Sequence, residues 1–310
     1  MTRKWTTQDI GGLEGRTALI TGASSGLGLH ASHALAGAGA RVLMACRNPG
    51  KGAGARDAVQ AGAPDATVEL AALDLADLSS VAGCAKTLAD AGTRLDLLIN
   101  NAGVMAVPYG QTADGFEMQI GTNHFGHFAL TAQLAPVLAD DARIVTVSSM
   151  AHRWTPGIDF DDINWSSRRY KRWQAYGDSK LANLLFHFEL TRRARAAGRG
   201  WTVAAAHPGY AATHLQLVAA EQKKASFEKR IMELGNRIFA QPAEMGALPE
   251  IYAATQADVQ SGDYIGPDGF QQMRGHPTKV GCRRAARDEG AAAALWQLSE
   301  QLTGTEFALD

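Results

Sequence analysis

Short apolar runs alternate with longer amphipathic stretches along this chain. A short apolar run between turn residues predicts a strand, and apolar positions three or four residues apart predict a helix. Strands are expected at Thr17–Thr21, Arg41–Ala45, Thr67–Ala72, Leu95–Asn100, Arg143–Ser148 and Trp201–Ala206. Helices are expected between them, most clearly at Gly28–Ala38, Leu78–Ala91, Gly115–Leu138 and Ala175–Ala197.

Several of these strands are apolar on both alternating faces, as at residues 18–20 and 97–99. Such a strand has to be covered on both sides, which is typical of a parallel sheet with helices on each face. Strands that alternate with helices are joined by right-handed crossovers. With a further short strand at Tyr264–Ile265, the pattern predicts an α/β Rossmann fold with a doubly wound, mostly parallel, seven-stranded sheet.

Three segments interrupt this alternation. Residues 151–174 form a polar connection rich in Trp and Arg, residues 210–242 contain a charged helical stretch from Glu221 to Phe239, and residues 262–280 are rich in Gly and Pro. None has the composition of a linker, and no repeat divides the chain. We therefore expect one domain over residues 1–310, elaborated on its substrate side at 151–174 and 210–242.

Basic and acidic side chains nearly cancel, for a formal net charge of −1. A nucleic acid or an anionic membrane would require a basic excess, so neither is an expected partner. Cys46, Cys84 and Cys282 form no CxxC pair, which argues against disulfides and a zinc site and fits a reducing cytosol. The N-terminus does not resemble a signal peptide, and no apolar run reaches about 18 residues. A cytoplasmic protein without a membrane span is expected.

The first expected strand leads into a glycine-rich turn that opens a helix. Glycine lets the backbone turn sharply and approach a ligand closely, and the N–H groups at a helix start attract anions. In a dinucleotide-binding fold, the pyrophosphate of the cofactor binds at this position. The turn residues expected to contact the cofactor are Gly22, Ser24, Ser25, Gly26, Leu27 and Gly28.

The spacing Gly-x3-Gly-x-Gly in this turn resembles the short-chain dehydrogenase/reductase family. Further motifs stand in that family's order, at residues 100–103, 148–149, 176–180 and 207–209, so that the resemblance extends from residue 15 to about 215. Residues 123–128 and the long insert before Tyr176 resemble the retinol-dehydrogenase-like branch. The resemblance implies a nicotinamide cofactor and a hydride transfer.

The end of the second expected strand indicates which nicotinamide cofactor is used. An NAD-specific enzyme places a carboxylate there, on the ribose 2′-hydroxyl, but this strand runs into Cys46, Arg47 and Asn48. A carboxylate would repel the 2′-phosphate of NADP, whereas an arginine can hold it with two parallel hydrogen bonds. We therefore expect NADP(H), with Arg47 on the phosphate. A solvated surface arginine is the alternative.

The resemblance implies other cofactor contacts. Asp74, beside Leu75, is implied to bind the adenine amino group, although it could also cap a helix that starts near Leu78. Asn101 is a further implied cofactor contact, and it is expected to brace the sheet rather than to touch the substrate. The remaining implied contacts are Ala102, Gly103, Tyr176, Lys180, Pro208, Gly209 and Thr213.

Tyr176 and Lys180 stand four residues apart in an expected helix, so both project from one face. A phenol has a pKa near 10, too high for proton exchange at neutral pH, and a nearby ammonium lowers it. Tyr176 is therefore the expected proton donor to a carbonyl oxygen. Lys180 is expected to contact the nicotinamide ribose as well.

Ser149 follows the fifth expected strand, where side chains face the ligand crevice and a hydroxyl can hold the substrate oxygen. The adjacent Ser148 should point the other way. The resemblance makes Ser149 the catalytic serine and Asn123 the fourth catalytic residue, which holds a water that connects Lys180 to solvent. A satisfied buried amide is the alternative for Asn123.

Two histidines beside Asn123 lack a third candidate ligand. His124 and His127 are therefore expected to pack in the core rather than to bind a metal. The aromatic residues of the insert could form an apolar wall for the substrate or could anchor the insert to the body of the domain. They are Trp154, Phe160, Trp165, Tyr170 and Trp173.

Together these residues predict an NADP(H)-dependent oxidoreductase acting on a carbonyl/alcohol pair of a small molecule, and the branch implies a bulky lipophilic substrate. Two other functions stay open. One is reduction of a conjugated carbon–carbon double bond, since protochlorophyllide reductases resemble the same branch, and the other is cofactor binding without turnover. The resemblance also implies a homodimer or homotetramer formed through the helices at Gly115–Leu138 and Ala175–Ala197.

Overall fold

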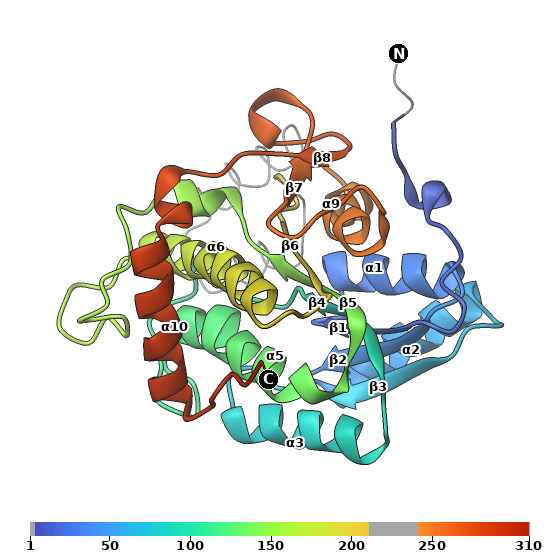
Figure 1. The fold of residues 1–310 in the computed structure, drawn as a ribbon, viewed down its shortest axis with the longest axis horizontal. Coiled ribbons are helices and arrows are strands. Elements are labelled where there is room, and N and C mark those ends of the chain that lie inside the picture. The colour runs from blue at the N-terminus through green and yellow to red at the C-terminus, as the bar shows by residue number, and fades with distance from the viewer. Residues whose placement is uncertain (1–3, 211–240, 310) are drawn as a thin grey trace, which may run out of the picture.

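The structure is a computed structural model that describes residues 4–210 and 241–309 (Figure 1). Eight strands of this described part form one sheet in the order β3-β2-β1-β4-β5-β6-β7-β8. The strands β1 to β7 are parallel, and β8 is antiparallel to β7. Their bounds are β1 (Thr17–Thr21), β2 (Arg41–Cys46), β3 (Val68–Ala72), β4 (Leu95–Asn100), β5 (Leu138–Val147), β6 (Thr202–Ala206), β7 (Tyr264–Pro267) and β8 (Pro277–Lys279).

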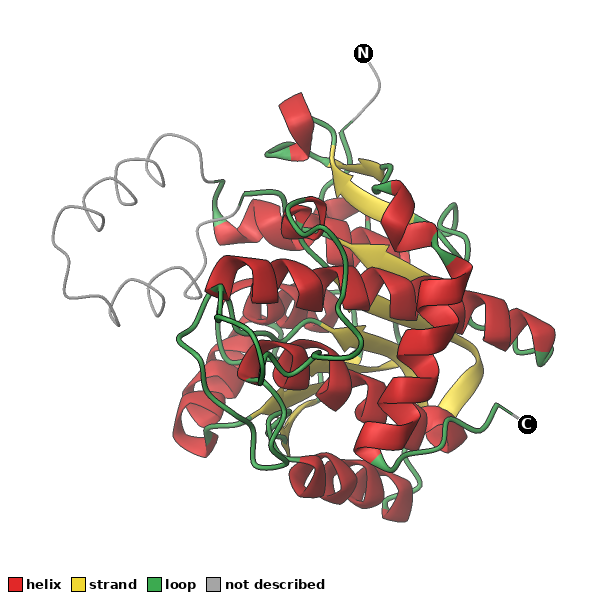
Figure 2. Cartoon of the chain, turned by 90° about the vertical axis from the view of Figure 1, so that its left-hand side faces the viewer, coloured by secondary structure: helices red, strands yellow, loops and turns green. Residues whose placement is uncertain are grey.

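Helices cover both faces of the sheet (Figure 2). Helices α1, α2 and α9 pack on one face of the sheet, and α3, α5 and α6 pack on the other. Each face has its own cluster of buried apolar side chains, which joins its helices to the strands. The bounds are α1 (Gly26–Gly37), α2 (Pro49–Gly62), α3 (Leu78–Asp90), α4 (Met118–Ile120), α5 (Gly126–Leu134), α6 (Arg172–Ala196), α9 (Ala243–Thr255) and α10 (Glu289–Thr303). Short 3-10 turns lie at Thr7–Asp9, Ala135–Val137, Met150–Arg153, Phe270–Gln272 and Arg284–Arg287.

The doubly wound, mostly parallel α/β fold is therefore confirmed. The sheet has one strand more than expected, because the Gly- and Pro-rich segment turns back on β7 as a short hairpin in which Pro267 pairs with Pro277. The strand order reverses between β1 and β4, which places a ligand crevice at the carboxyl ends of these strands. No helix among the described residues has both the length and the apolar character needed to cross a bilayer.

The helical stretch expected from Gly115 to Leu138 is found from Met118 to Val137, but it is not a regular α-helix throughout. The segment instead contains the short α4, a π-helical turn at Gly121–Phe125, and then α5. A Cβ at Gly126 would lie 2.4 Å from the carbonyl oxygen of Leu75, so a glycine is needed where this segment meets the loop after β3. The glycine thus allows this helical segment to pack closely against a distant part of the chain.

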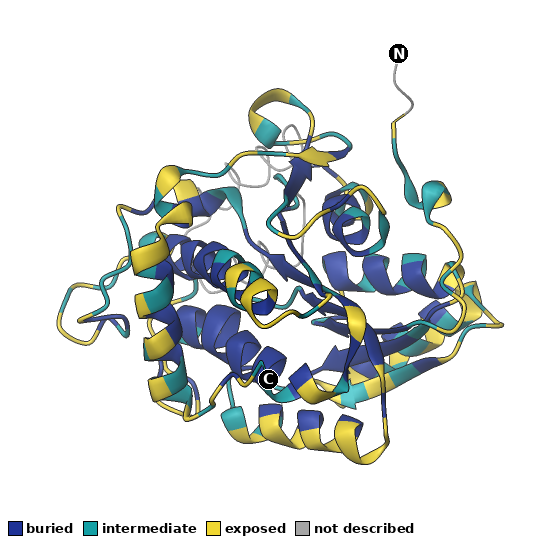
Figure 3. Ribbon diagram, in the orientation of Figure 1, coloured by how far each residue is buried: buried dark blue, intermediate teal, exposed yellow. Residues whose placement is uncertain are grey.

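The C-terminal helix α10 covers the outer sides of α5 and α6. Its Trp296 ring lies 5.2 Å from Phe128 of α5 and 5.9 Å from Phe186 of α6, measured between ring centroids, and Phe307 packs on the same group. Figure 3 shows α5 and the middle of α6 buried, with the exposed surface on α10. The two helices implied as the oligomer interface are thus packed against the chain's own α10.

We therefore expect the protein to be a monomer of 32.9 kDa in size-exclusion chromatography with light scattering. The physical reason is that an interface built on α5 and α6 would first require the aromatic contacts of α10 to open. A stable species of twice that mass, at micromolar protein concentration, would contradict this expectation.

Candidate active site

The glycine-rich turn between β1 and α1 forms a close-fitting cradle. Gly22 and Gly26 have φ of +69° and +57°, which only glycine adopts without strain. A Cβ at Gly28 would lie 2.6 Å from the side-chain nitrogen Nδ2 of Asn101. That nitrogen is held in place because it donates to the backbone carbonyl of Thr21, at the end of β1, at 2.7 Å. Ser25 is the N-cap of α1, but its side chain does not cap the helix, so the first N–H groups are free to bind an anion. The cradle fits a pyrophosphate.

The other residues expected to contact the cofactor lie at the same carboxyl edge of the sheet, with one exception. Thr213 lies outside the described residues. The others are Ser24 and Leu27 in the turn, Leu75 after β3, Ala102 and Gly103 after β4, and Pro208 and Gly209 after β6.

Arg47 follows β2 directly and is exposed. Among the described residues it has no hydrogen-bond or ion-pair partner, and its neighbour Asn48 caps α2 by accepting from Lys51 N at 2.9 Å.

Asp74 accepts from the backbone N–H of residue 76, and the N-cap of α3 is Asp77. The alternative role of Asp74 as a helix cap is therefore wrong, while its adenine contact stays a prediction.

The predicted proton donor and its lysine lie side by side on α6. Both side chains are buried, and Lys180 Nζ lies 5.9 Å from the centre of the Tyr176 ring. Lys180 Nζ donates to the carbonyl of Val147 at the end of β5, at 3.1 Å. Ser148 points away from the crevice, as expected, and donates to the backbone carbonyl of Lys180 at 2.8 Å. These two bonds fix α6 against the carboxyl end of β5.

Burial controls the protonation of both groups. It raises the pKa of Tyr176 to about 12, although the adjacent Ser149 hydroxyl opposes the shift, and it lowers the pKa of Lys180 to about 8. The expected acidification of the phenol by the ammonium is therefore not found. The reason is that burial disfavours both charged forms, and that the amine bonds a backbone carbonyl instead of the phenol. The phenol is held as a proton donor.

Asn123 lies in the π-helical turn and is fully buried. Its Oδ1 accepts from Val104 N at 2.7 Å, and its Nδ2 donates to Val104 O and to Ser179 Oγ, each at 2.9 Å. A Cβ at Gly103 would lie 3.0 Å from Asn123 Oδ1 and 3.5 Å from Lys180 Nζ, so the asparagine and the lysine face the same glycine. The amide is satisfied within the protein, and its role in holding a water stays a prediction.

Ser179 is a site residue that the sequence motif contains but that we did not predict. Its Oγ donates to the carbonyl of Tyr176 at 2.8 Å and accepts from Asn123. It thus joins the catalytic helix to the π turn. The available signal was a polar residue three positions after Tyr176, inside a helix expected to be buried.

A family model described as short chain dehydrogenase matches residues 16–159. Human retinol dehydrogenase 13 is 39% identical over 299 residues, which are 95% of this chain and 86% of that protein. The chain belongs to the short-chain dehydrogenase/reductase family. The short-chain dehydrogenase/reductase drtF of Aspergillus calidoustus is 36% identical over 310 residues, covering 93% of this chain and 94% of its own.

Solved structures agree with this membership. An uncharacterized protein from Mycobacterium Paratuberculosis matches with a TM-score of 0.82 and 46% identity, over 99% of this chain and 100% of that one. An NAD(P)-dependent gluconate 5-dehydrogenase from Beutenbergia cavernae, with bound NADP at low occupancy, matches with a TM-score of 0.60 and 29% identity, over 79% and 92%. As a member of the short-chain dehydrogenase/reductase family, the protein is an oxidoreductase, and its resemblance to the retinol-dehydrogenase-like branch is confirmed.

The aromatic residues of the insert fall into two groups, one buried and one exposed. Trp165 is buried beneath the Arg168 guanidinium, and the Tyr170 hydroxyl donates to the buried Glu117 at 2.7 Å, so these residues anchor the insert. Trp154 and Trp173 are instead 62% and 40% exposed. Phe160 is half-buried against the core.

The two exposed tryptophans pack on each other, and Trp173 also packs beside Tyr176, the predicted proton donor. The ring centroids of Trp154 and Trp173 are 6.2 Å apart, and the Trp173 centroid is 6.4 Å from that of Tyr176. Trp173 and Tyr176 are three residues apart on α6 and so share a helix face. An apolar surface therefore leads from solvent to the phenol.

The histidines of the π-turn region are packed as expected. His124 is buried among the rings of α5 and α6, and its Nε2 bonds Ser299 Oγ of α10 at 2.9 Å. His127 is also buried, with both ring nitrogens bonded. His124 Nδ1 has no hydrogen-bond partner among the described residues, but it is buried among these rings.

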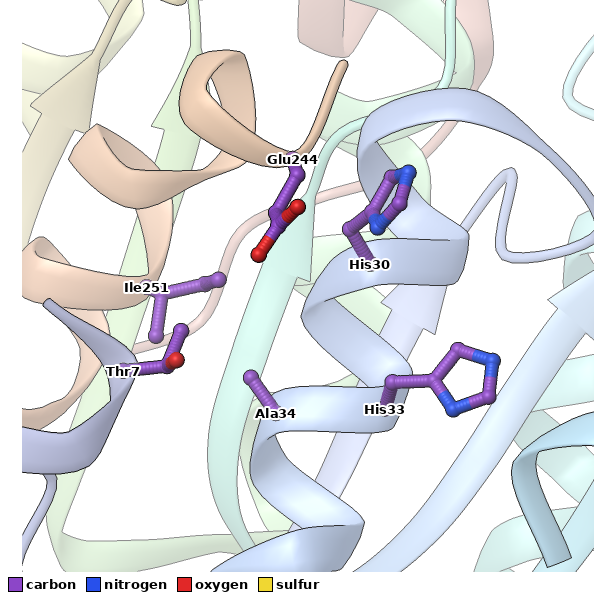
Figure 4. A pocket seen from close by; sticks show the side chains of 6 residues that line it. All are labelled: Thr7, His30, His33, Ala34, Glu244 and Ile251. Atoms are coloured by element: carbon purple, nitrogen blue, oxygen red, sulfur yellow. The ribbon is translucent and has the colours of Figure 1, made fainter. Parts of the chain in front are cut away.

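A separate hollow of about 220 Å³ lies between α1 and α9, on the opposite face of the sheet from α6 (Figure 4). None of the predicted site residues lines it. The lining residues are Thr7, His30, His33, Ala34, Glu244 and Ile251.

Proposed function

We propose that this protein is an NADP(H)-dependent oxidoreductase that transfers a hydride between the nicotinamide and the carbonyl or alcohol carbon of an apolar small molecule. The observation that carries the proposal is a buried phenol at Tyr176 that adjoins the Ser149 hydroxyl, with the Lys180 amine 5.9 Å from the centre of its ring. This arrangement supplies a proton at the carboxyl edge of the sheet, where the cradle for the pyrophosphate also lies.

The cofactor preference is supported by the residues after β2. A bound NADP(H) supplies the hydride, and the protein's contribution is to hold and orient it. Arg47 is exposed without a partner among the described residues, and no carboxylate adjoins it at the end of β2. A guanidinium in that position suits a 2′-phosphate. The gluconate 5-dehydrogenase relative was solved with NADP, which adds support.

The protein's own groups complete the reduction. Ser149 holds the carbonyl oxygen by a hydrogen bond, and Tyr176 Oη gives its proton to that oxygen as the carbon gains the hydride. The phenolate that remains is favoured by the adjacent Ser149 hydroxyl, which already opposes the rise in the pKa of Tyr176. In the oxidation direction, the phenolate takes the proton back from the alcohol. Atoms and charges balance in both directions.

The apolar nature of the substrate is supported by two observations. Trp154 and Trp173 present exposed rings next to Tyr176, and exposed apolar surface beside a reactive group commonly marks a binding site. Several relatives are named retinol dehydrogenases, among them the human protein described above. Retinol is a lipophilic alcohol, in agreement with an aromatic entrance.

Replacing Trp173 by Ala is expected to lower kcat/KM for a long-chain or aromatic aldehyde about tenfold, because burying one large apolar side chain contributes about 1.5–3 kcal/mol. The value for a two- or three-carbon aldehyde should stay within about twofold, since such a substrate is too short to reach the indole. Trp154→Ala should act in the same direction. The matched control is Leu70→Ala, a half-exposed apolar side chain on the edge strand β3. Equal losses for long and short aldehydes would contradict the assignment.

The function itself is tested by incubating the purified protein with NADPH and a conjugated enone, and then identifying the product. We expect an allylic alcohol, formed as the nicotinamide absorbance falls. A saturated ketone would show double-bond reduction instead. Tight NADPH binding without consumption, over a panel of apolar aldehydes and ketones, would overturn the proposed enzymatic activity.

A further inference from the structure

One buried imidazole joins the cofactor side of the site to its catalytic side. His127 of α5 is 1% exposed. Its Nδ1 lies 3.0 Å from the carbonyl oxygen of Asn123, and its Nε2 lies 2.9 Å from Thr21 Oγ1 at the end of β1. The ring therefore spans the distance between the π turn and the strand that leads into the glycine-rich turn.

The hydrogen atoms in this chain of bonds follow from its chemistry. A carbonyl oxygen can only accept, so Nδ1 of His127 carries the proton and Nε2 presents a lone pair. Thr21 Oγ1 accepts the backbone N–H groups of Asn101 and Ala102, each at 2.9 Å, and can donate its own hydrogen to Nε2. The Thr21 hydroxyl also lies 3.4 Å from the Ile99 carbonyl, a longer contact than the 2.9 Å to Nε2, so a donation to Nε2 is consistent with the geometry. Burial lowers the pKa of His127 to about 4, which keeps the ring neutral at neutral pH.

Both ends of the chain lead to residues of the proposed site. At one end, the two N–H groups that Thr21 Oγ1 accepts belong to the loop after β4, so the threonine holds this loop against the start of the glycine-rich turn. The next residue, Gly22, packs closely on the same loop, since a Cβ there would lie 3.0 Å from Ala102. At the other end, the Asn123 side chain bonds Ser179, which in turn bonds the Tyr176 carbonyl. In a regular α-helix the Asn123 carbonyl would accept the backbone N–H of residue 127. In this structure, the side-chain Nδ1 of His127 also lies within hydrogen-bond distance of the Asn123 carbonyl oxygen, at 3.0 Å.

We propose that His127 is a positioning residue that sets the distance between the cofactor cradle and the proton donor by tying Thr21 to Asn123. The inference rests on the proposed function, because that function assigns the cradle and Tyr176 their roles. His127 touches neither set of reacting atoms itself. Its loss should therefore weaken cofactor binding and slow the chemical step together, without removing either.

The test uses three substitutions of His127 in the full chain. His127→Leu removes both bonds. His127→Asn keeps an amide near the Nδ1 position, within reach of the Asn123 carbonyl, and His127→Gln keeps one near the Nε2 position, within reach of Thr21. The matched control is His124→Leu, which removes a buried imidazole of the same segment whose bond runs outward to Ser299. For each variant we would measure the melting temperature, the Kd for NADPH, and kcat at saturating cofactor and aldehyde.

We expect His127→Leu to raise the Kd for NADPH about tenfold and to lower kcat about tenfold, the size of effect that an unsatisfied buried group typically has. His127→Gln should restore the Kd more than kcat, and His127→Asn should restore kcat more than the Kd. His124→Leu should lower the melting temperature and change neither quantity by more than about twofold.

A merely structural role for His127 would give equal losses of melting temperature in the two Leu variants with unchanged Kd and kcat, and that result would overturn the inference. If the wild-type protein binds NADPH but reduces no carbonyl, the proposed function fails. The role of His127 is then decided by the Kd for NADPH alone, compared between the wild type and His127→Leu. Equal Kd values for wild type and His127→Leu would in that case reject it.

Discussion

Replacing Tyr176 by Phe is expected to lower kcat for carbonyl reduction by about a hundredfold to ten-thousandfold, the usual contribution of a positioned proton donor. The ring and its packing against Trp173 remain, so the fold is retained. The Kd for NADPH should stay within about threefold, because the turn at residues 22–28 and the end of β2 are unchanged. The measurement is steady-state turnover alongside equilibrium cofactor titration. Tyr109→Phe, which removes the hydroxyl of a half-exposed tyrosine outside the site, is the control.

The pH dependence of the wild-type protein gives a second check on the same residue. The reduction step needs the phenol protonated, and the burial that raises the pKa of Tyr176 favours that form. The rate of reduction should therefore fall as pH rises through the pKa of Tyr176, and the rate of alcohol oxidation should rise over the same range. Full turnover in Tyr176→Phe, or an unchanged pH profile in that variant, would show that the proton comes from another group.

The parts of the fold that the sequence predicts well are those that burial alone determines. The bounds of β1 and β4 agree with the expected ranges, because every residue of both strands is buried and turn residues follow directly. The four catalytic candidates were predicted on two grounds. Residue type and helical spacing indicate Tyr176 and Lys180, whereas the roles of Ser149 and Asn123 follow from the family resemblance of their motifs.

Features that depend on contacts between distant segments could not be predicted. The close approach of Gly126 to Leu75 joins two distant segments, and the cover over α5 and α6 depends on Trp296 more than a hundred residues further along the chain. The pKa of Tyr176 was expected to fall, and burial reverses the sign. Burial is a property of the tertiary structure, so motif spacing shows which groups meet and not which charge state is favoured.

Replacing Arg47 by Asp is expected to raise the Kd for NADPH about a hundredfold and to leave the Kd for NADH unchanged or lower. A hydrogen bond to a charged group contributes about 1.5–3 kcal/mol, where 1.4 kcal/mol corresponds to tenfold, and the new carboxylate adds repulsion of the 2′-phosphate. NADH lacks that phosphate, and its free ribose hydroxyl can donate to the carboxylate. Isothermal titration with both cofactors measures the two constants independently of turnover.

Two further variants separate the causes of this change. Arg47→Ser removes the cation without adding a charge, so it should weaken NADPH binding about tenfold and leave NADH binding unaffected. Arg195→Asp, on an exposed position near the end of α6, alters the net charge as Arg47→Asp does and should change neither Kd. Parallel weakening of NADPH and NADH in Arg47→Asp would mean that the guanidinium acts on the shared part of the cofactor, and the preference for NADP would then have to arise elsewhere.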